Sequence, residues 1–305
     1  MICLAGLACF VPAGRCDSVT LIPIADTTIM ETAPSNNNGG LAWFTSGGNH
    51  YAVRSRALIK FDIAGNIPAH SQITAASLEL TVTKTPGDGY AVGYFDLHRL
   101  LRNWGEGGKS TANSPGQGLP ASTNEATWLS PLAYTTMWTT PGGAATNDYA
   151  AKVTASQIVF DDVQSPYQFP DPAGDPAPMI ADIQSWLDNP ATNFGWIFIC
   201  ESEDVANTTR RFASREDPNY PPSLTITFNP PPPVRITRDD HLGNQFRLFF
   251  TAQAERSYAV EFRDSLSAAS LWNTLTNIPA LSTNTDLVIT STMTGGQRFY
   301  RLHVQ

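Results

Sequence analysis

The sequence predicts an all-β protein, built as a β-sandwich with one short helix and followed by a small second β-sandwich. Only 15% of its 305 residues are charged, whereas about 25% is typical of soluble domains. Gly, Pro, Ser, Thr and Asn take the place of charge, which favours strands joined by many turns. Short apolar segments alternate with polar residues at the period of a strand, and only one segment has helical spacing.

Residues 1–18 are predicted to be a signal peptide. The first charge is Arg15, and an apolar run this short suits the hydrophobic region of an export signal rather than a membrane span. The basic segment that normally precedes such a region is missing, so we expect the true start to lie upstream. The alternative for this stretch is a buried first strand. We expect the mature protein to be extracellular or at the cell surface.

The cysteines agree with an exported protein that lacks disulfides. Cys3, Cys9 and Cys16 lie in the predicted leader, so the mature body would contain only Cys200. Cys200 ends an apolar run and is predicted to be a buried free thiol. Disulfides and cysteine-based metal sites are therefore excluded.

Four consecutive prolines at 230–233 divide the chain. Such a run forms a stiff, extended linker. We therefore assign a main β-domain to residues 19–229 and a small β-module to residues 234–305.

The main domain shows four clear strand patterns, at 55–63, 76–84, 194–200 and 222–228. One helix is predicted over 178–189, and its apolar stripe consists of Met179, Ile180, Ile183, Trp186 and Leu187. Residues 105–125 show no periodicity and are predicted to be an irregular loop. The tail has strand-like runs at 246–251, 257–263, 286–290 and 298–304, which favour an immunoglobulin- or fibronectin-like sandwich.

Several motifs together resemble a known family. They include Arg56-Ala-Leu-Ile-Lys-Phe-Asp62, Trp104-Gly-Glu-Gly107, Trp186-Leu-Asp-Asn-Pro190 and Arg211-Phe-Ala-Ser-Arg-Glu216. In their order and spacing, residues 19–228 resemble the DNRLRE domain of disaggregatase-related proteins, which is similar to carbohydrate-binding modules beside polysaccharide-active enzymes. The resemblance implies a secreted, jelly-roll-like sandwich that is usually non-catalytic. Through Trp272 and Gln297-Arg-Phe-Tyr-Arg301, the tail resembles a small module of secreted bacterial proteins.

No common catalytic motif is present. The chain has no Gly-x-Ser-x-Gly elbow and no His-Glu-x-x-His zinc site, so we expect no enzymatic activity. The alternative is a glycoside hydrolase that uses a carboxylate pair from Glu201, Glu203 and Asp204. Adjacent acids after a strand are more often a solvated loop.

A calcium site is predicted in a turn-rich segment near the start of the domain. Asp26, Asn36 and Asn38 supply the oxygen ligands that Ca²⁺ prefers. The alternative is that the Asn and Gly residues here only provide turn geometry.

Two basic sets are the predicted ligand-binding residues: Arg54, Arg56 and Lys60 on one strand, and Arg210, Arg211 and Arg215 on or near another. Even spacing places the first set on one side of its strand. If the two sets meet, they form a basic patch suited to an anionic polysaccharide. The alternative for each arginine is an ion pair with an acid such as Asp62, Glu216 or Asp217.

The sequence therefore predicts a non-catalytic protein that binds polysaccharide, with acidic polymers as the favoured class. The alternatives are an enzyme that degrades surface polysaccharide and a purely structural surface protein. A net charge of −8 disfavours nucleic acid as a partner. No segment beyond the leader is apolar enough for membrane insertion, and we expect a monomer.

Overall fold

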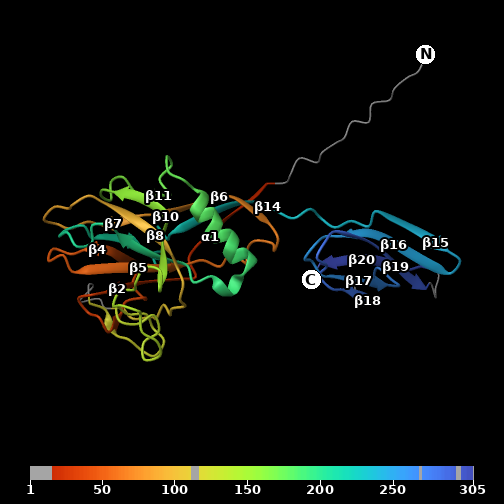
Figure 1. Ribbon diagram of the computed structural model, residues 1–305, viewed down its shortest axis with the longest axis horizontal. Coiled ribbons are helices and arrows are strands. Elements are labelled where there is room, and N and C mark those ends of the chain that lie inside the picture. Colours follow the sequence, from red (N-terminus) through yellow and green to blue (C-terminus); the bar gives the residue numbers. More distant parts are fainter. Residues whose placement is uncertain (1–15, 111–116, 268–269, 293–296, 305) are drawn as a thin grey trace, which may run out of the picture. The chain divides into compact units, whose positions relative to one another are not determined.

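The computed structural model describes residues 16–110, 117–267, 270–292 and 297–304. Residues 1–15, which include most of the predicted leader, lie outside this part. The chain forms two compact units, 1–231 and 232–305, and the division falls within the four-proline run. Strands dominate both units, and the described residues contain one α-helix, so the all-β prediction is confirmed (Figure 1).

Two sheets form the main unit. The smaller one has the strand order β1 (Asp17–Leu21), β14 (Ser223–Asn229), β6 (Gln72–Leu80) and β11 (Tyr167–Phe169). The larger one has the order β10 (Tyr149–Val159), β8 (Gly93–Leu100), β12 (Trp196–Cys200), β5 (Arg54–Lys60), β4 (Trp43–Gly48), β13 (Arg210–Ala213) and β7 (Val82–Lys84), and β2 (Ala25–Met30) also pairs with β5. A separate small pair joins β3 (Asn36–Asn37) to β9 (Leu119–Pro120).

Alternation along the strands builds the main core between these sheets. On β14, Leu224 and Ile226 are fully buried while Thr225 is partly exposed, as expected of a strand with one face on the core. They join Phe44, Phe198 and Phe212 of the larger sheet in one cluster. The predicted buried thiol, Cys200, belongs to the same cluster and is fully buried.

The larger sheet is covered on its other face as well. Strand β12 is buried along its whole length. Its residue Ile197 packs in a second cluster with Trp104, Trp128 and Trp138. These three tryptophans come from residues 101–110 and 117–148, which have little regular structure and fold back beside β2 (Figure 1). These residues are therefore held by their tryptophans and take part in the fold.

The single helix lies where its apolar stripe predicts. Helix α1 spans Ala177–Asp188, begins with a proline in its first turn and ends before Asn189. Its buried residues Met179, Ile183, Trp186 and Leu187 join the main core. The ring centroids of Trp186 and Trp196 lie 4.7 Å apart, which joins the helix to β12. A short 3₁₀ turn, η1 (Pro190–Thr192), follows.

The tail unit is a sandwich of two three-stranded sheets. One has the order β15 (Arg238–Leu242), β16 (Gln245–Ala252) and β19 (Thr285–Thr292), and the other β18 (Asn273–Ile278), β17 (Tyr258–Arg263) and β20 (Phe299–Val304). Leu248 and Phe250 of the first sheet pack with Tyr258 and Val260 of the second. None of the described helices has both the length and the hydropathy to cross a bilayer.

Candidate functional site

Two cations lie side by side where β13 meets β7. Arg211 pairs with Lys84 in the register of these antiparallel strands. The next pair is Phe212 with Val82, so β7 carries one extra residue at this point. A bulge of this kind turns a side chain toward the other face of its strand. Phe212 and Val82 both lie in the core, while Lys84 and Arg211 both face an outer hollow.

Arg211 is stacked on an indole ring. Its guanidinium carbon lies 4.2 Å from the ring centroid of Trp43, and its Nε is buried without a hydrogen-bond partner. Partial burial lowers the pKa of Arg211, but an arginine stays charged in proteins. In the part of the chain that the structure describes, neither Arg211 nor Lys84 forms an ion pair. Like charges opposite each other on paired strands are destabilising.

The hollow that these two cations face has a volume of about 310 Å³, near the lower end of the range for small-ligand sites. We call it the Arg211 hollow. Besides the two cations and the turn Thr85-Pro86-Gly87, its lining includes neutral polar side chains, an imidazole and one acid, namely Thr45, Asn49, His50, Asn207, Thr209 and Asp88. It thus offers charged donors together with amide and hydroxyl groups.

The rim of the hollow is fixed by turn geometry. The Oδ1 atom of Asn49 accepts hydrogen bonds from the backbone N–H groups of Tyr51 and Val53. The carbonyl oxygen of Asn49 accepts from the backbone N–H of Asn207 at 3.1 Å. Asn207 has a φ of 63°, a conformation that Asn tolerates better than most residues. These contacts hold two amide side chains beside the cations.

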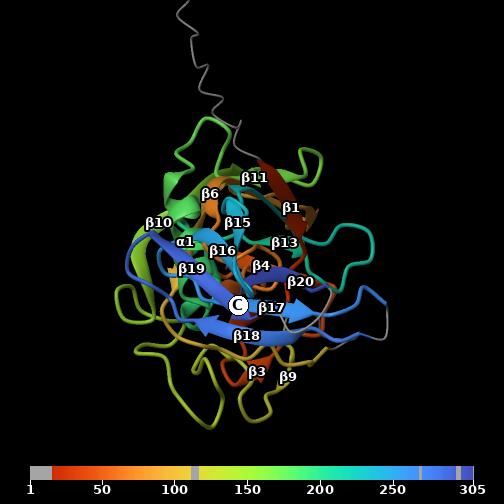
Figure 2. The ribbon, with the colours of Figure 1, turned by 90° about the vertical axis from the view of Figure 1, so that its right-hand side faces the viewer.

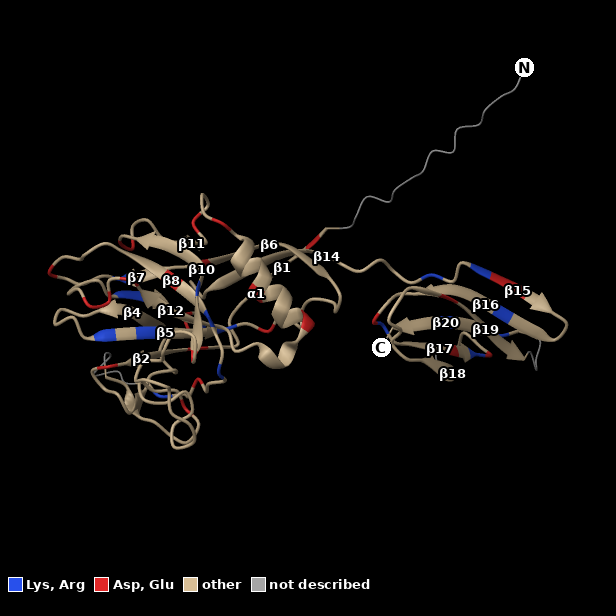
Figure 3. Ribbon diagram, in the orientation of Figure 1, with Lys and Arg blue, Asp and Glu red and all other residues tan. Residues whose placement is uncertain are grey.

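Arg54 and Arg56 share one face of β5, as their spacing predicts, but both have acid partners. Their guanidinium carbons lie 5.4 and 5.6 Å from the ring centroid of Trp128. Arg54 forms a two-pronged pair with Glu31, its Nη2 lying 2.8 Å from Oε1. Arg56 is buried and its Nη2 lies 2.6 Å from Oε1 of Glu203. Both arginines thus form ion pairs with acids that lie outside β5 (basic segments of β5 in Figure 3).

The remaining predicted cations are dispersed. Arg210 is fully buried and donates hydrogen bonds to five backbone carbonyl groups, those of Ala91, Val159, Phe160, Thr208 and Thr209. Arg215 binds both carboxylate oxygens of Glu106 and also contacts Glu216. Lys60 is partly exposed at the end of β5. Of the six predicted residues, Arg211 is therefore the one that lines the hollow.

The acidic loop after β12 carries the carboxylates of the predicted catalytic pair, Glu201, Glu203 and Asp204. Glu203 is engaged by Arg56. The pKa values of Glu201 and of the buried Asp96 are both raised, first by burial and for Glu201 also by the charge of Asp96. Glycosidases keep their two carboxyl groups about 5–9.5 Å apart so that a sugar bond fits between them. The carboxylate pair from Glu201, Glu203 and Asp204 stays a prediction.

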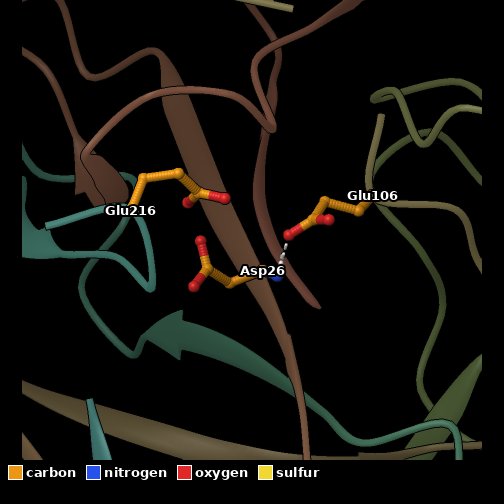
Figure 4. A group of neighbouring side chains, drawn as sticks. All are labelled: Asp26, Glu106 and Glu216. Carbon is orange, nitrogen blue, oxygen red and sulfur yellow. Dashed lines mark hydrogen bonds between the residues drawn. The ribbon is translucent and has the colours of Figure 1, made fainter. Parts of the chain in front are cut away.

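Asp26 lies in a cluster of three carboxyl groups. It is almost fully buried on β2, and its carboxylate oxygens lie within 4.8 Å of those of Glu106 and Glu216 (Figure 4). Arg215 completes the cluster, since its backbone N–H donates to Asp26 Oδ2 at 2.8 Å. The guanidinium of Arg215 contacts the other two acids, Glu106 and Glu216.

The asparagines predicted to join Asp26 in a calcium site make other contacts. The Nδ2 of Asn36 donates to the carbonyl oxygen of Gln117, and that of Asn38 lies against the sulfur of Met30. The intervening Asn37 reaches the carbonyl oxygens of Glu106 and Ala126. Calcium binding here stays a prediction, and the acids that lie near Asp26, Glu106 and Glu216, were not predicted from the sequence.

Burial and neighbouring charge change the protonation of this cluster. Burial is the main reason that the pKa of Asp26 rises to about 8, and Glu216 and Glu106 raise it further. The N–H and guanidinium of Arg215 act in the opposite direction. Burial also raises the pKa of Glu106. At neutral pH the cluster therefore holds a proton on Asp26.

The comparisons with known proteins give no family. Neither the models of protein families nor the curated proteins contain a match to this chain. The interpretation of the site therefore depends on its own geometry.

Proposed function

We propose that this is an extracellular, non-catalytic protein that binds an acidic polysaccharide in the Arg211 hollow. The observation that carries the proposal is the juxtaposition of Arg211 and Lys84. Within the described residues these two neighbouring cations have no carboxylate partner. A carboxylate on a bound sugar would supply the missing countercharge.

The chemistry of the hollow suits a uronic acid unit. Arginine presents a planar set of donors that matches a carboxylate, and lysine adds a compact charge. Stacking on Trp43 holds the guanidinium in one orientation, which reduces the entropy lost on binding. Asn49, Asn207 and Thr209 offer partners for sugar hydroxyl groups.

Two features of the sequence also support the proposal. The ordered motifs of residues 19–228 resemble the DNRLRE domain, whose members are usually non-catalytic. The predicted leader would send the protein to where such polymers occur.

Binding to sodium polygalacturonate and alginate, measured by affinity electrophoresis and calorimetry, tests the proposal. Loss of one charged hydrogen bond costs about 1.5–3 kcal/mol, so we expect Arg211→Ala and Lys84→Ala each to weaken binding about 10- to 100-fold. Arg54→Ala is the matched control, because that arginine is exposed to a similar degree but already paired with Glu31. Unchanged binding by the Arg211 and Lys84 variants would contradict the site, and absence of binding to every acidic polymer would contradict the function.

Incubation of the purified protein with the same polymers tests whether it is an enzyme. We expect no release of reducing ends and no unsaturated products from these polymers. Turnover that survives purification and depends on Glu201 or Asp96 would favour an enzyme that degrades surface polysaccharide.

A further inference from the structure

The tail unit carries a cation–indole arrangement of its own. On the outer face of the β18–β17–β20 sheet, the guanidinium carbons of Arg263 and Arg301 lie 4.5 and 4.4 Å from the ring centroid of Trp272. Strand β17, which carries Arg263, lies between the other two strands (Figure 2). We call these three residues the Trp272 face. One aromatic ring thus holds two cations close together.

The charges on the Trp272 face are only partly balanced. Arg301, with a side chain 46% exposed, pairs with Glu261 through an Nε–Oε2 distance of 2.6 Å. The Nε of Arg263 is buried without a hydrogen-bond partner. Among the residues that the structure describes, no carboxylate forms an ion pair with Arg263. The face therefore keeps one unpaired positive charge.

This construction repeats that of the Arg211 hollow. In both places a guanidinium lies against a tryptophan, its Nε is buried and unbonded, and it forms no ion pair with a described residue. We propose that the Trp272 face is a second binding surface for an acidic polysaccharide. Charge complementarity points to this occupant, because a carboxylate of the polymer can meet Arg263, which forms no ion pair with a described residue.

Charge density distinguishes a polysaccharide from nucleic acid as the occupant. Duplex DNA carries about one negative charge per 1.7 Å of its axis, and its binding needs several cations. The unit from 232 to 305 has seven arginines, no lysine and six acidic residues, so it is close to neutral. A polymer with at most one carboxylate per sugar matches one unpaired cation better.

Two weak sites on one chain would strengthen binding to a long polymer. Once one unit is bound, the other meets the same polymer at a high effective concentration, and the gain in avidity reaches roughly 100-fold or more when both sites can engage. The identity of the polymer rests on the proposed function. The existence of the second surface does not.

The full-length protein with both substitutions Arg263→Gln and Arg301→Gln tests the proposal. We expect retention by immobilised polygalacturonate to fall about tenfold or more, while the affinity for trigalacturonate, measured by calorimetry, stays the same. Arg238→Gln is the matched control, because this arginine lies over Phe249 on the other sheet of the same unit and is paired with Asp240. Circular dichroism checks that each variant is folded.

The outcomes separate this proposal from the hollow. Loss of retention in the Trp272-face variant, with normal retention in Arg211→Ala, supports the tail surface and contradicts the hollow. Loss only in Arg211→Ala overturns the tail surface and leaves the proposed function standing. An equal loss of polygalacturonate retention in Arg238→Gln also overturns the tail surface. So does binding of duplex DNA that is tighter than binding of polygalacturonate and that depends on Arg263.

Discussion

At the scale of single residues, neighbouring arginines of one strand have opposite roles. Arg210 and Arg211 are adjacent on β13, so their side chains point to opposite faces. Arg210 is enclosed and binds backbone carbonyl groups, whereas Arg211 faces the hollow. The sequence shows two basic residues here, but which of them can meet a ligand depends on which face of the strand is packed against the core.

Replacing these two arginines should therefore affect stability very differently. Arg210→Ala leaves several buried carbonyl groups without donors and creates a cavity, so we expect a loss of about 3–5 kcal/mol in the free energy of unfolding. Arg211→Ala should cost less than about 1 kcal/mol. Urea denaturation of both variants measures the difference. Equal losses would contradict the assignment of Arg210 to the core.

Asp26 should make stability depend on pH. Its pKa is raised from 3.8 to about 8 in the folded protein, so between these values the folded state holds a proton that the unfolded state has lost. The stabilisation is complete below about pH 4, declines as pH rises and is lost above about pH 8. Asp26→Asn, a neutral substitute, should lack this decline and be more stable than the natural protein at pH 9. The free energy of unfolding of both proteins is measured as a function of pH. Curves that run parallel for the two proteins would contradict the prediction.

At the scale of elements, local patterns predicted the helix and part of the strand framework. The helix over 178–189 and the strands over 194–200 and 222–228 occur within a residue or two of the predicted positions. In the tail unit, strands β15 and β18 were missed, because their sequences are polar and lack clear alternation. In the main unit, the predicted ranges did not include several strands of the larger sheet, among them β4, β8 and β10. A one-residue break at Thr81 separates β6 from β7 within the single predicted strand 76–84.

The site was less predictable than the framework, because it depends on contacts that local patterns do not contain. Asp26 meets Glu106 across 80 positions of sequence, through a segment held by buried tryptophans rather than by periodic strands. Lys84 reaches the hollow through a bulge. The spacing of Arg54 and Arg56 placed them correctly on one face, but their acid partners, Glu31 and Glu203, come from distant turns.

One glycine tests how tightly β12 joins its neighbour β5. Gly195 has a φ of 75°, and a side chain there would overlap the carbonyl oxygen of Ile59. We expect Gly195→Ala to cost about 3 kcal/mol or more, since conformational strain and displacement of the adjoining strand combine. Gly89, with a φ of 99° and open space around it, is the control, and Gly89→Ala should cost only about 1 kcal/mol. Thermal denaturation compares them, and similar losses would contradict the close approach.

At the scale of the whole molecule, the chain consists of two units with separate cores. The cluster around Phe198 and Ile226 lies entirely in the first unit, and the cluster around Phe250 and Val260 lies entirely in the second. The chain division falls within the four prolines. A polyproline segment forms no internal hydrogen bonds and carries little cooperativity. Each core should therefore unfold as its own cooperative unit.

Differential scanning calorimetry of the full chain should thus show two transitions. Truncation of a buried branched side chain costs about 1–4 kcal/mol and lowers the midpoint of the unit that contains it. Val260→Ala should lower one midpoint only, and Ile226→Ala should lower only the other, since both side chains are fully buried in separate cores. A single transition that both substitutions shift would show that the units unfold together. In that case the linker would transmit stability between them, and the two binding surfaces could not be treated as independent in the avidity argument.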